Sequence, residues 1–402
     1  MTSAKEILEV PSRIEPARLE QLPVAVTDLV ANVAAKSAIL GDKLHPATAA
    51  SLAGLVRIMN CYYSNLIEGN NTHPRDAERA LAGDLYADES RRNLQLEAAA
   101  HIRVQIEIDA MGQRGDLPEP ASAEFILWLH EQFSRDAPTE MLHIKQGKLE
   151  IVMEPGKWRS KPEHDVGVGR HIPPSSERVV AFMEHFEKRY RFENMGKSEA
   201  ILAIASAHHR FNYIHPFPDG NGRVSRLMSH AMAWKAGIAA HGLWSISRGL
   251  ARGIDSRGDY KRMMDHADMP RQGDLDGRGN LSQRALTDFT EWFLKICLDQ
   301  LEFMSGLFDL ANLENRLEKL IDVHDELKPQ ALALVKEALI RGEFARGEIE
   351  RVTGIPERSA RRVLNDVIDA GILGSATQKG PLSLRFTAKN SEILFPLLFP
   401  EI

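Results

Sequence analysis

The chain has 402 residues, of which 43% are hydrophobic and 26% are charged, and its formal net charge is −6. This length can hold two or three domains with a sizeable core, and the composition is ordinary for a soluble globular protein. The negative charge argues against a chain that coats nucleic acid by electrostatics alone.

The positions of the two cysteines and the lengths of the apolar runs indicate the cellular compartment. Cys61 and Cys297 both lie in apolar helical patterns, which favours core thiols in a reducing compartment over a disulfide framework. The sequence shows no secretory signal pattern and no uninterrupted apolar run of the length that a bilayer requires. We therefore expect a cytoplasmic protein without a membrane segment.

Residues 1–45 are weakly patterned, and the first strong helix is predicted over about residues 48–67, with Gly69 ending it. Ser64 and Glu68 stand four residues apart near the end of this helix, so both side chains lie on one helix face. From the spacing alone, Glu68 is either an ordinary surface glutamate or a carboxylate that meets a partner elsewhere in the chain.

Residues 76–145 have helical periodicity, after which the pattern changes. Residues 149–153 and 165–168 are short and alternating or β-branched, and Pro155 and Gly156 lie between them. These two segments predict a small hairpin within an otherwise helical protein.

Residues 215–226 read His-Pro-Phe-Pro-Asp-Gly-Asn-Gly-Arg-Val-Ser-Arg and lie between two apolar helical patterns. This arrangement predicts a tight loop that leads into a helix N-terminus, where free N–H groups and the helix dipole favour phosphate. Gly220 and Gly222 allow the backbone to approach an anion closely, and Arg223 and Arg226 can reach toward the same end of the helix.

Two further side chains of this stretch suggest reaction chemistry. Asp219 is an oxygen ligand placed beside the predicted phosphate site, as Mg²⁺ requires. His215 precedes that site, where its imidazole could take a proton from an attacking hydroxyl.

The C-terminal part begins after a long helical stretch over residues 282–327, in which a break is expected near Gly306. Residues 328–402 then show helix, helix, glycine turn, helix and an alternating strand, which predicts a winged helix-turn-helix. This part has 11 Lys and Arg against 9 Asp and Glu, so it is only mildly basic, and DNA binding, protein docking and dimerisation all stay open. The candidate DNA-binding residues, on the outer face of the recognition helix, are Arg358, Arg361 and Arg362.

The stretch 215–226 resembles the Fic family signature H-x-F-x-D/E-G-N-G-R-x-x-R at every fixed position. The resemblance implies a mainly α-helical protein with a Fic-type helical core and a small β-hairpin flap. Together with the C-terminal pattern, it divides the chain into an N-terminal helical region at 1–75, a catalytic core at 76–300, a connecting helix at 301–327 and a winged helix-turn-helix at 328–402.

The resemblance also implies an activity, namely transfer of AMP from ATP to a Ser, Thr or Tyr hydroxyl of a protein. In such an enzyme His215 deprotonates the hydroxyl and Asp219 holds Mg²⁺ between the α- and β-phosphates. An aromatic residue commonly lies against the nucleotide, for which Tyr260 is the candidate, although a packing role explains this tyrosine equally well. The nucleotide-binding set implied by the family is Gly220, Asn221, Gly222, Arg223, Arg226 and Tyr260.

Two other segments resemble parts of the same family. Residues 64–69 are similar to the inhibitory pattern S/T-x-x-x-E-G/N, in which Glu68 pairs with Arg226 and removes the guanidinium that holds the γ-phosphate. Residues 155–159 and 169–174 resemble the flap, which holds a target segment by strand addition. The flap residues expected to do so are Val166, Gly167, Val168 and Gly169.

Several functional alternatives stay open at this point. The partners implied are ATP and a target protein hydroxyl, with self-modification, a homodimer and DNA as further expectations. One rival function is removal of AMP from a modified protein, with Glu68 positioning water. The other is a transcription regulator that senses nucleotide and binds DNA through the winged helix.

Overall fold

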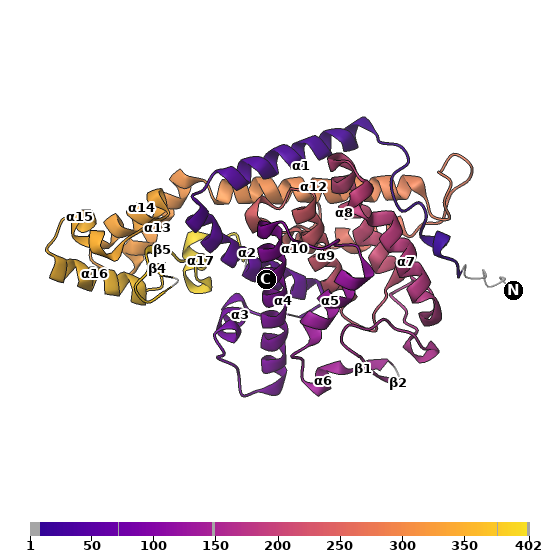
Figure 1. Ribbon diagram of the computed structural model, residues 1–402, viewed down its shortest axis with the longest axis horizontal. Coiled ribbons are helices and arrows are strands. Elements are labelled where there is room, and N and C mark those ends of the chain that lie inside the picture. Colours follow the sequence, from indigo (N-terminus) through magenta and orange to yellow (C-terminus); the bar gives the residue numbers. More distant parts are fainter. Residues whose placement is uncertain (1–8, 71, 147–148, 376, 400–402) are drawn as a thin grey trace.

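Two long helices run side by side through the structure, α1 (Val24–Asp42) and α12 (Gln283–Leu307) (Figure 1). They belong to a computed structural model that describes residues 9–70, 72–146, 149–375 and 377–399. The face of α1 that includes Val26, Val33 and Leu40 is buried in the core. This pairing gives the other helices a common surface to pack on.

The helix α1 was not predicted, because its sequence is rich in alanine and carries apolar residues around much of its circumference. Such a sequence lacks the contrast between polar and apolar faces from which amphipathic helices are recognised. By length and composition alone α1 could cross a membrane, and a helix that packs in a protein core meets the same criteria.

The centre of the fold is a helix pair, α8 (Lys197–Ile214) and α9 (Asn221–Lys235), joined by the loop of residues 215–220. The helices α2 (Pro46–Ile67), α4 and α5 pack against α9 around this loop, and α2 confirms the helix predicted at 48–67. The remaining helices of this part are α3 (Pro74–Leu81), α4 (Glu89–Arg114), α5 (Ala123–Ser134), α6 (Thr139–Leu142), α7 (Val179–Tyr190), α10 (Ile246–Arg252) and α11 (Asp259–Ala267). Short 3-10 helices lie at Pro11–Ile14, Pro162–His164, Ser176–Arg178, Phe192–Asn194, Ala240–Gly242 and Arg346–Glu348.

A small β-hairpin is present, but its two strands are not the predicted pair. The strand β2 (Leu149–Val152) pairs antiparallel with β1 (His143–Gln146), which precedes it directly in the chain. In segment 165–168 only Val168 pairs, in a single bridge with His171. The predicted partner was wrong because a strand immediately upstream can pair through a short connection, whereas prolines interrupt the chain between 153 and 165.

The C-terminal helices and a small sheet form a separate body at one side of the molecule, here called the C-terminal module and comprising residues 310–399 (Figure 1). The break expected near Gly306 falls at Phe308 and Asp309, between α12 and α13. Three short strands form an antiparallel sheet in the order β3-β5-β4. The elements of the module are α13 (Leu310–Val323), α14 (Ala331–Arg341), β3 (Glu343–Phe344), α15 (Ile349–Thr353), α16 (Glu357–Asp369), β4 (Leu373–Gly374), β5 (Leu382–Leu384) and α17 (Ala388–Leu394).

The end of the chain returns from the module to the main body. The ring of Phe399 lies edge-on to that of Tyr62 in α2, with centroids 5.7 Å apart. Residues 394–399, here called the tail, therefore contact the helix that carries Ser64 and Glu68.

Two helix glycines test how closely the central helices are packed. A Cβ on Gly112 of α4 would lie 2.5 Å from the ring of Trp234, whose indole N–H donates to Asp109 Oδ1 at 2.8 Å and holds the ring in place. We expect Gly112→Ala to reduce the free energy of unfolding by about 1–3 kcal/mol. The matched control Gly54→Ala has no atom within 4 Å of the new methyl group and should raise stability by about 0.5–1 kcal/mol. Urea unfolding measures both changes, and equal effects would contradict this packing.

Candidate active site

The signature loop is shaped by two left-handed residues. α8 ends at Ile214, and His215 has φ 51° with its N–H donating to Phe211 O at 2.9 Å. Gly220 has φ 81° and immediately precedes α9, a conformation that glycine adopts without strain. The chain therefore reverses between the two helices within six residues, 215–220.

The side chain of Asn221 holds this loop closed. Its Oδ1 accepts the N–H of Phe217 at 2.9 Å, and its Nδ2 donates to Phe217 O at 2.8 Å. Asn221 is 2% exposed, so in this structure its amide shapes the loop instead of facing solvent. The N–H groups of Asn221, Gly222 and Arg223 lie in the first turn of α9 and have no acceptor within the helix. At the predicted anion site these backbone groups, and not the Asn221 side chain, are therefore the available donors.

The side chain of Phe217 fixes the loop to the core of the protein. It is fully buried, and its ring stacks on His130 of α5 with centroids 3.9 Å apart and an interplanar angle of 4°. His130 Nδ1 in turn accepts the N–H of Gly156 at 2.9 Å. His130 was not identified from the sequence, because nothing in its local pattern separates it from other helix histidines.

His215 lies half-buried at the start of the loop in a protonation state that suits a base. Burial, reinforced by the nearby charge of Arg159, lowers the pKa of His215 to about 4. At neutral pH the imidazole is therefore uncharged and able to accept a proton.

Ser64, Glu68 and Arg226 meet, as predicted. The Arg226 guanidinium is 1% exposed and donates to Glu68 Oε1 at 2.6 Å, to Ser64 Oγ at 2.8 Å and to Ser64 O at 3.2 Å. Burial raises the pKa of Glu68, but the charge and hydrogen bond of Arg226 outweigh it and hold that pKa below its ordinary value. A Cβ on Gly222 would lie 2.2 Å from Glu68 Oε1, so the carboxylate stands directly against the first turn of α9.

Arg223 has a partner that the sequence did not reveal. Its guanidinium forms an ion pair with Glu97, a buried residue of α4, and lies 3.4 Å from Asp219 Oδ2. It also lies over the ring of Phe133, 4.9 Å from the centroid. The one available signal was a glutamate at position 97 directly before three alanines, 98–100, in a stretch with helical periodicity.

Asp219 is the residue best placed for a metal ion. Its side chain is 56% exposed, and its Oδ1 accepts the N–H of Gly220 at 2.7 Å. Among the residues that the structure describes, no group of three or more His, Cys, Asp or Glu could hold a metal. A single accessible carboxylate beside an anion site fits Mg²⁺, which keeps several waters and takes its other ligands from substrate phosphates.

Tyr260 of α11 lies near Arg226 and packs among other aromatic side chains. Its hydroxyl hydrogen-bonds with His208 Nε2 at 2.8 Å, and its ring stacks on Trp292. Burial raises the pKa of Tyr260 to about 12, and the charge of Arg226 opposes this shift. Both the nucleotide role and the packing role considered for this tyrosine are compatible with its position.

Two of the predicted flap residues, Val168 and Gly169, lie in a tight turn that ends at His171, and Val166 and Gly167 directly precede it. Two hydrogen bonds of 3.0 Å join the backbones of Val168 and His171, and Gly169 between them has φ 60°. His171 Nε2 contacts Tyr213 O at 2.7 Å and ties the turn to the end of α8. The segment is largely exposed at Gly167, Val168 and Gly169, with Val166 half-buried.

Arg159 was recognised only as part of the flap-like stretch, yet its side chain is fully buried under the signature loop. Its guanidinium donates to His215 O at 2.7 Å and to Ile214 O at 3.1 Å. Its backbone N–H donates to Pro216 O at 3.0 Å. Three successive carbonyls of the loop region are thus held by one residue.

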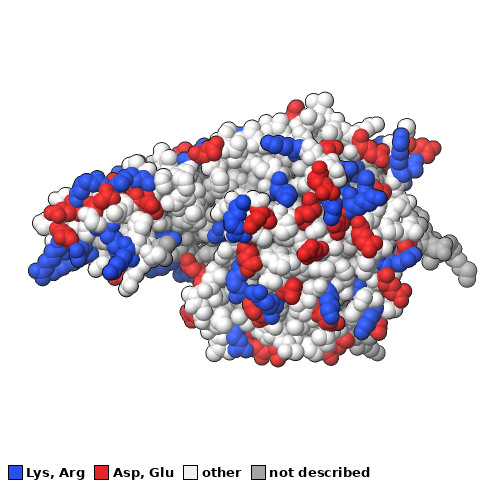
Figure 2. Space-filling model, viewed as in Figure 1, with Lys and Arg blue, Asp and Glu red and all other residues white. Residues whose placement is uncertain are grey.

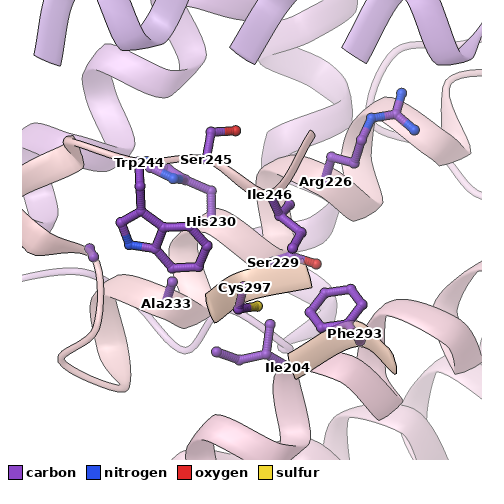
Figure 3. A pocket seen from close by; sticks show the side chains of 11 residues that line it. Ile204, Arg226, Ser229, His230, Ala233, Trp244, Ser245, Ile246, Phe293 and Cys297 are labelled. Atoms are coloured by element: carbon purple, nitrogen blue, oxygen red, sulfur yellow. The ribbon is translucent and has the colours of Figure 1, made fainter. Parts of the chain in front are cut away.

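A small cavity of about 20 Å³ lies behind the Arg226 side chain, and its walls include Ser229, His230, Trp244 and Cys297. Figure 3 shows the guanidinium of Arg226 extending away from these residues. The cavity has room for about one water molecule. It is therefore too small for a substrate.

The fold and the site define a class of protein: a helical domain in which a loop and a helix N-terminus form an anion site with a neutral histidine ahead of it. Residues 120–233, which contain the whole signature, match the Fic/DOC family. Residues 120–233 are therefore similar to the Fic/DOC family over the whole signature and the helices beside it.

Curated relatives share only part of this chain. It is 36% identical over 85 residues to the protein adenylyltransferase Fic of Drosophila erecta and to that of Drosophila melanogaster. The matched stretch covers 21% of this chain and 17% of each relative.

Solved structures agree with the fold over a longer range. A Fic family protein from Desulfovibrio desulfuricans G20 superposes with a TM-score of 0.52 at 18% identity, covering 91% of this chain and 98% of that one. A Fic domain-containing signalling protein from Bacteroides thetaiotaomicron VPI-5482 gives 0.50 at 18% identity, covering 69% and 95%. At this level of identity the two structures show the fold alone.

Proposed function

We propose that the protein is an adenylyltransferase that moves AMP from ATP to a Ser, Thr or Tyr hydroxyl of a protein, and that Glu68 keeps it inactive. The observation that carries the proposal is the ion pair between Glu68 and Arg226, 2.6 Å long, at the N-terminal end of α9. A carboxylate held there takes the place of an anionic ligand on the same guanidinium.

The chemistry follows from the positions of the side chains. The α-phosphate binds at the first turn of α9, where the backbone N–H groups stabilise the charge that develops on it. The target oxygen bonds to the α-phosphorus, the bond to the bridging oxygen breaks and pyrophosphate leaves. The neutral imidazole of His215 takes the hydroxyl proton. Asp219 would hold a Mg²⁺ ion, which would neutralise negative charge on the phosphates when bound.

Inhibition acts through the γ-phosphate. While Glu68 and Ser64 occupy the Arg226 guanidinium, that group cannot also hold the end of a triphosphate. ATP bound without this contact lacks the alignment of its α-phosphorus with the attacking oxygen. The enzyme in this state therefore has its catalytic groups in place and its nucleotide misaligned.

The largely exposed segment Val166–Gly169 receives the target. Its backbone groups can pair with an extended segment by strand addition, which aligns a hydroxyl with little dependence on sequence. The target is a protein of unknown identity, and a second copy of the chain is one candidate, either as a substrate or as a dimer partner.

Removal of AMP is the alternative reaction, and one observation favours it. The Glu68 side chain is 33% exposed, so its carboxylate is accessible to a water molecule beside the anion site. In that reaction Glu68 orients the water, and replacing this glutamate abolishes activity. In adenylyl transfer the same replacement raises activity, so one variant separates the two.

We expect Glu68→Gly to raise labelling by α-labelled ATP about tenfold or more, because each 1.4 kcal/mol of competing pair energy is worth a factor of ten. Adding His215→Ala should abolish the signal. Autoradiography and mass spectrometry of the labelled protein measure both. The matched control Glu193→Gly removes a glutamate that is 62% exposed and should leave labelling at the wild-type level. An unchanged signal for Glu68→Gly would refute the inhibitory role.

We further propose that the C-terminal module contains a winged helix-turn-helix. The order α14, β3, α15, α16, β4, β5 is typical of that motif, with α16 as the recognition helix. Its Arg358, Arg361 and Arg362 are exposed, and Figure 2 shows Lys and Arg side chains gathered along the outer part of the module. This basic face fits a DNA backbone, and the regulator function depends on it.

If this face binds DNA, replacing Arg358 and Arg362 with alanine should weaken duplex binding and lower the slope of log affinity against log salt by about two. The control Arg114→Ala removes a side chain that is 58% exposed on α4 and should change neither quantity. Gel retardation over a salt series makes the measurement. Absence of any wild-type complex at moderate salt would leave the module with a protein-binding role.

A further inference from the structure

The backbone of His215 is held in a conformation that needs support. A φ of 51° places this residue in the left-handed region, which costs about 1–3 kcal/mol for a residue with a side chain. The carbonyls on both sides of the strained residue and its own carbonyl all accept hydrogen bonds from Arg159. The support therefore comes from outside the signature.

The same guanidinium also holds the far end of the flap segment. It donates to Pro174 O at 2.5 Å and to Ser176 Oγ at 2.9 Å, and Asp165 lies 3.5 Å away. Arg159 thus joins both ends of the segment 159–176 to the loop that carries His215.

We propose that Arg159 is the positioning residue of this site. It fixes the orientation of His215 and holds the flap segment at a fixed position relative to His215. The expected change in kcat rests on the proposed adenylyl transfer, whereas the positioning of His215 and the flap rests on the hydrogen bonds of Arg159 alone. If the target segment pairs with the flap turn, one buried side chain sets the distance between the incoming hydroxyl and its base.

The charge of Arg159 has a second effect. Burial lowers its pKa to about 10, so it stays protonated at neutral pH and disfavours protonation of His215. Three other titratable groups interact electrostatically with His215: His171 of the flap, Asp219 of the loop and Glu68 of α2. The charge of Asp219 favours the protonated imidazolium of His215, whereas the charges of Arg159 and His171 disfavour it.

The test compares two substitutions in the Glu68→Gly background. Arg159→Gln removes the charge, so we expect the pKa of His215 to move from about 4 toward its ordinary value, with a fall in kcat. Arg159→Lys keeps the charge and loses the fork geometry, so we expect the pKa to stay low while kcat falls about tenfold or more and KM for ATP changes little. NMR titration, assigned with His215→Ala, reports the pKa whether or not the protein is an adenylyltransferase.

The control is Arg210→Lys, because Arg210 is equally buried and donates to Pro16 O, away from the loop. It should reduce stability without moving the pKa of His215. If Arg159→Gln does not fold, the kcat of Arg159→Lys decides. A kcat of Arg159→Lys equal to that of the Glu68→Gly parent, or a His215 pKa that Arg159→Gln leaves unchanged, would overturn the proposal.

A separate observation concerns the tail. The hydroxyl of Tyr63 donates to Leu398 O at 3.1 Å, and Tyr62 packs edge-on against Phe399. These tyrosines directly precede Ser64 in α2. The module is also fixed to α3, since the carboxylate of Glu78 accepts the N–H of Ala388 at 3.1 Å.

We infer that the tail stabilises the last turns of α2 and so keeps Glu68 on Arg226. A partner that draws the tail away from α2 then releases the inhibition. This inference depends on the proposed function for its activity arm, whereas the ordering of α2 can be measured directly.

We expect Phe399→Ala and Tyr63→Phe to speed hydrogen exchange at residues 66–70 several-fold and to raise self-labelling by ATP. In this segment the N–H of Gly69 bonds to Leu66 O and that of Asn70 to Asn65 O. The control Leu397→Ala alters a tail side chain that is 65% exposed and should change neither quantity. Unchanged exchange in both variants would refute the inference that the tail stabilises the end of α2. Faster exchange without increased labelling would instead count against the adenylyltransferase function.

Discussion

Burial of arginine side chains is the constraint on which this site depends. A guanidinium removed from water must find partners for its N–H groups, and here the partners come from segments far apart in the sequence. Arg226 joins α9 to α2, Arg223 joins it to α4, and Arg159 joins the loop to the flap segment. The positions of α2, α4 and the flap around the anion site follow from these pairings.

The combined geometry describes a site whose parts are already in place. The loop is closed by Asn221, the imidazole of His215 is neutral at physiological pH, and α9 offers unpaired N–H groups. The residue proposed to inhibit the site lies outside the matched domain, since Glu68 precedes residue 120. The proposed catalytic and inhibitory groups therefore lie in different segments of the chain.

The sequence allowed prediction of those features that are local or that a long motif specifies. The helix at 48–67, the break after residue 307 and the loop before α9 follow from periodicity and glycine positions, and the meeting of Glu68 with Arg226 follows from the family pattern. Glu97 and Arg159 could not be found in this way, because their partners lie 126 and 56 residues away and leave no periodic signal. The hairpin partner was predicted wrongly because residues 143–146 lie at the end of a stretch that was read as helical, so their strand was not recognised.

The location of Glu68 at the very end of its helix has a mechanical consequence. It is the C-cap of α2, and most of the residues before it are buried against the rest of the fold, so the helix as a whole is immobile. Unwinding one terminal turn is enough to withdraw the carboxylate, and helix ends fray at low cost. The fraction of molecules with a free Arg226 guanidinium therefore changes smoothly with temperature, and the proposed inhibition is partial at every temperature.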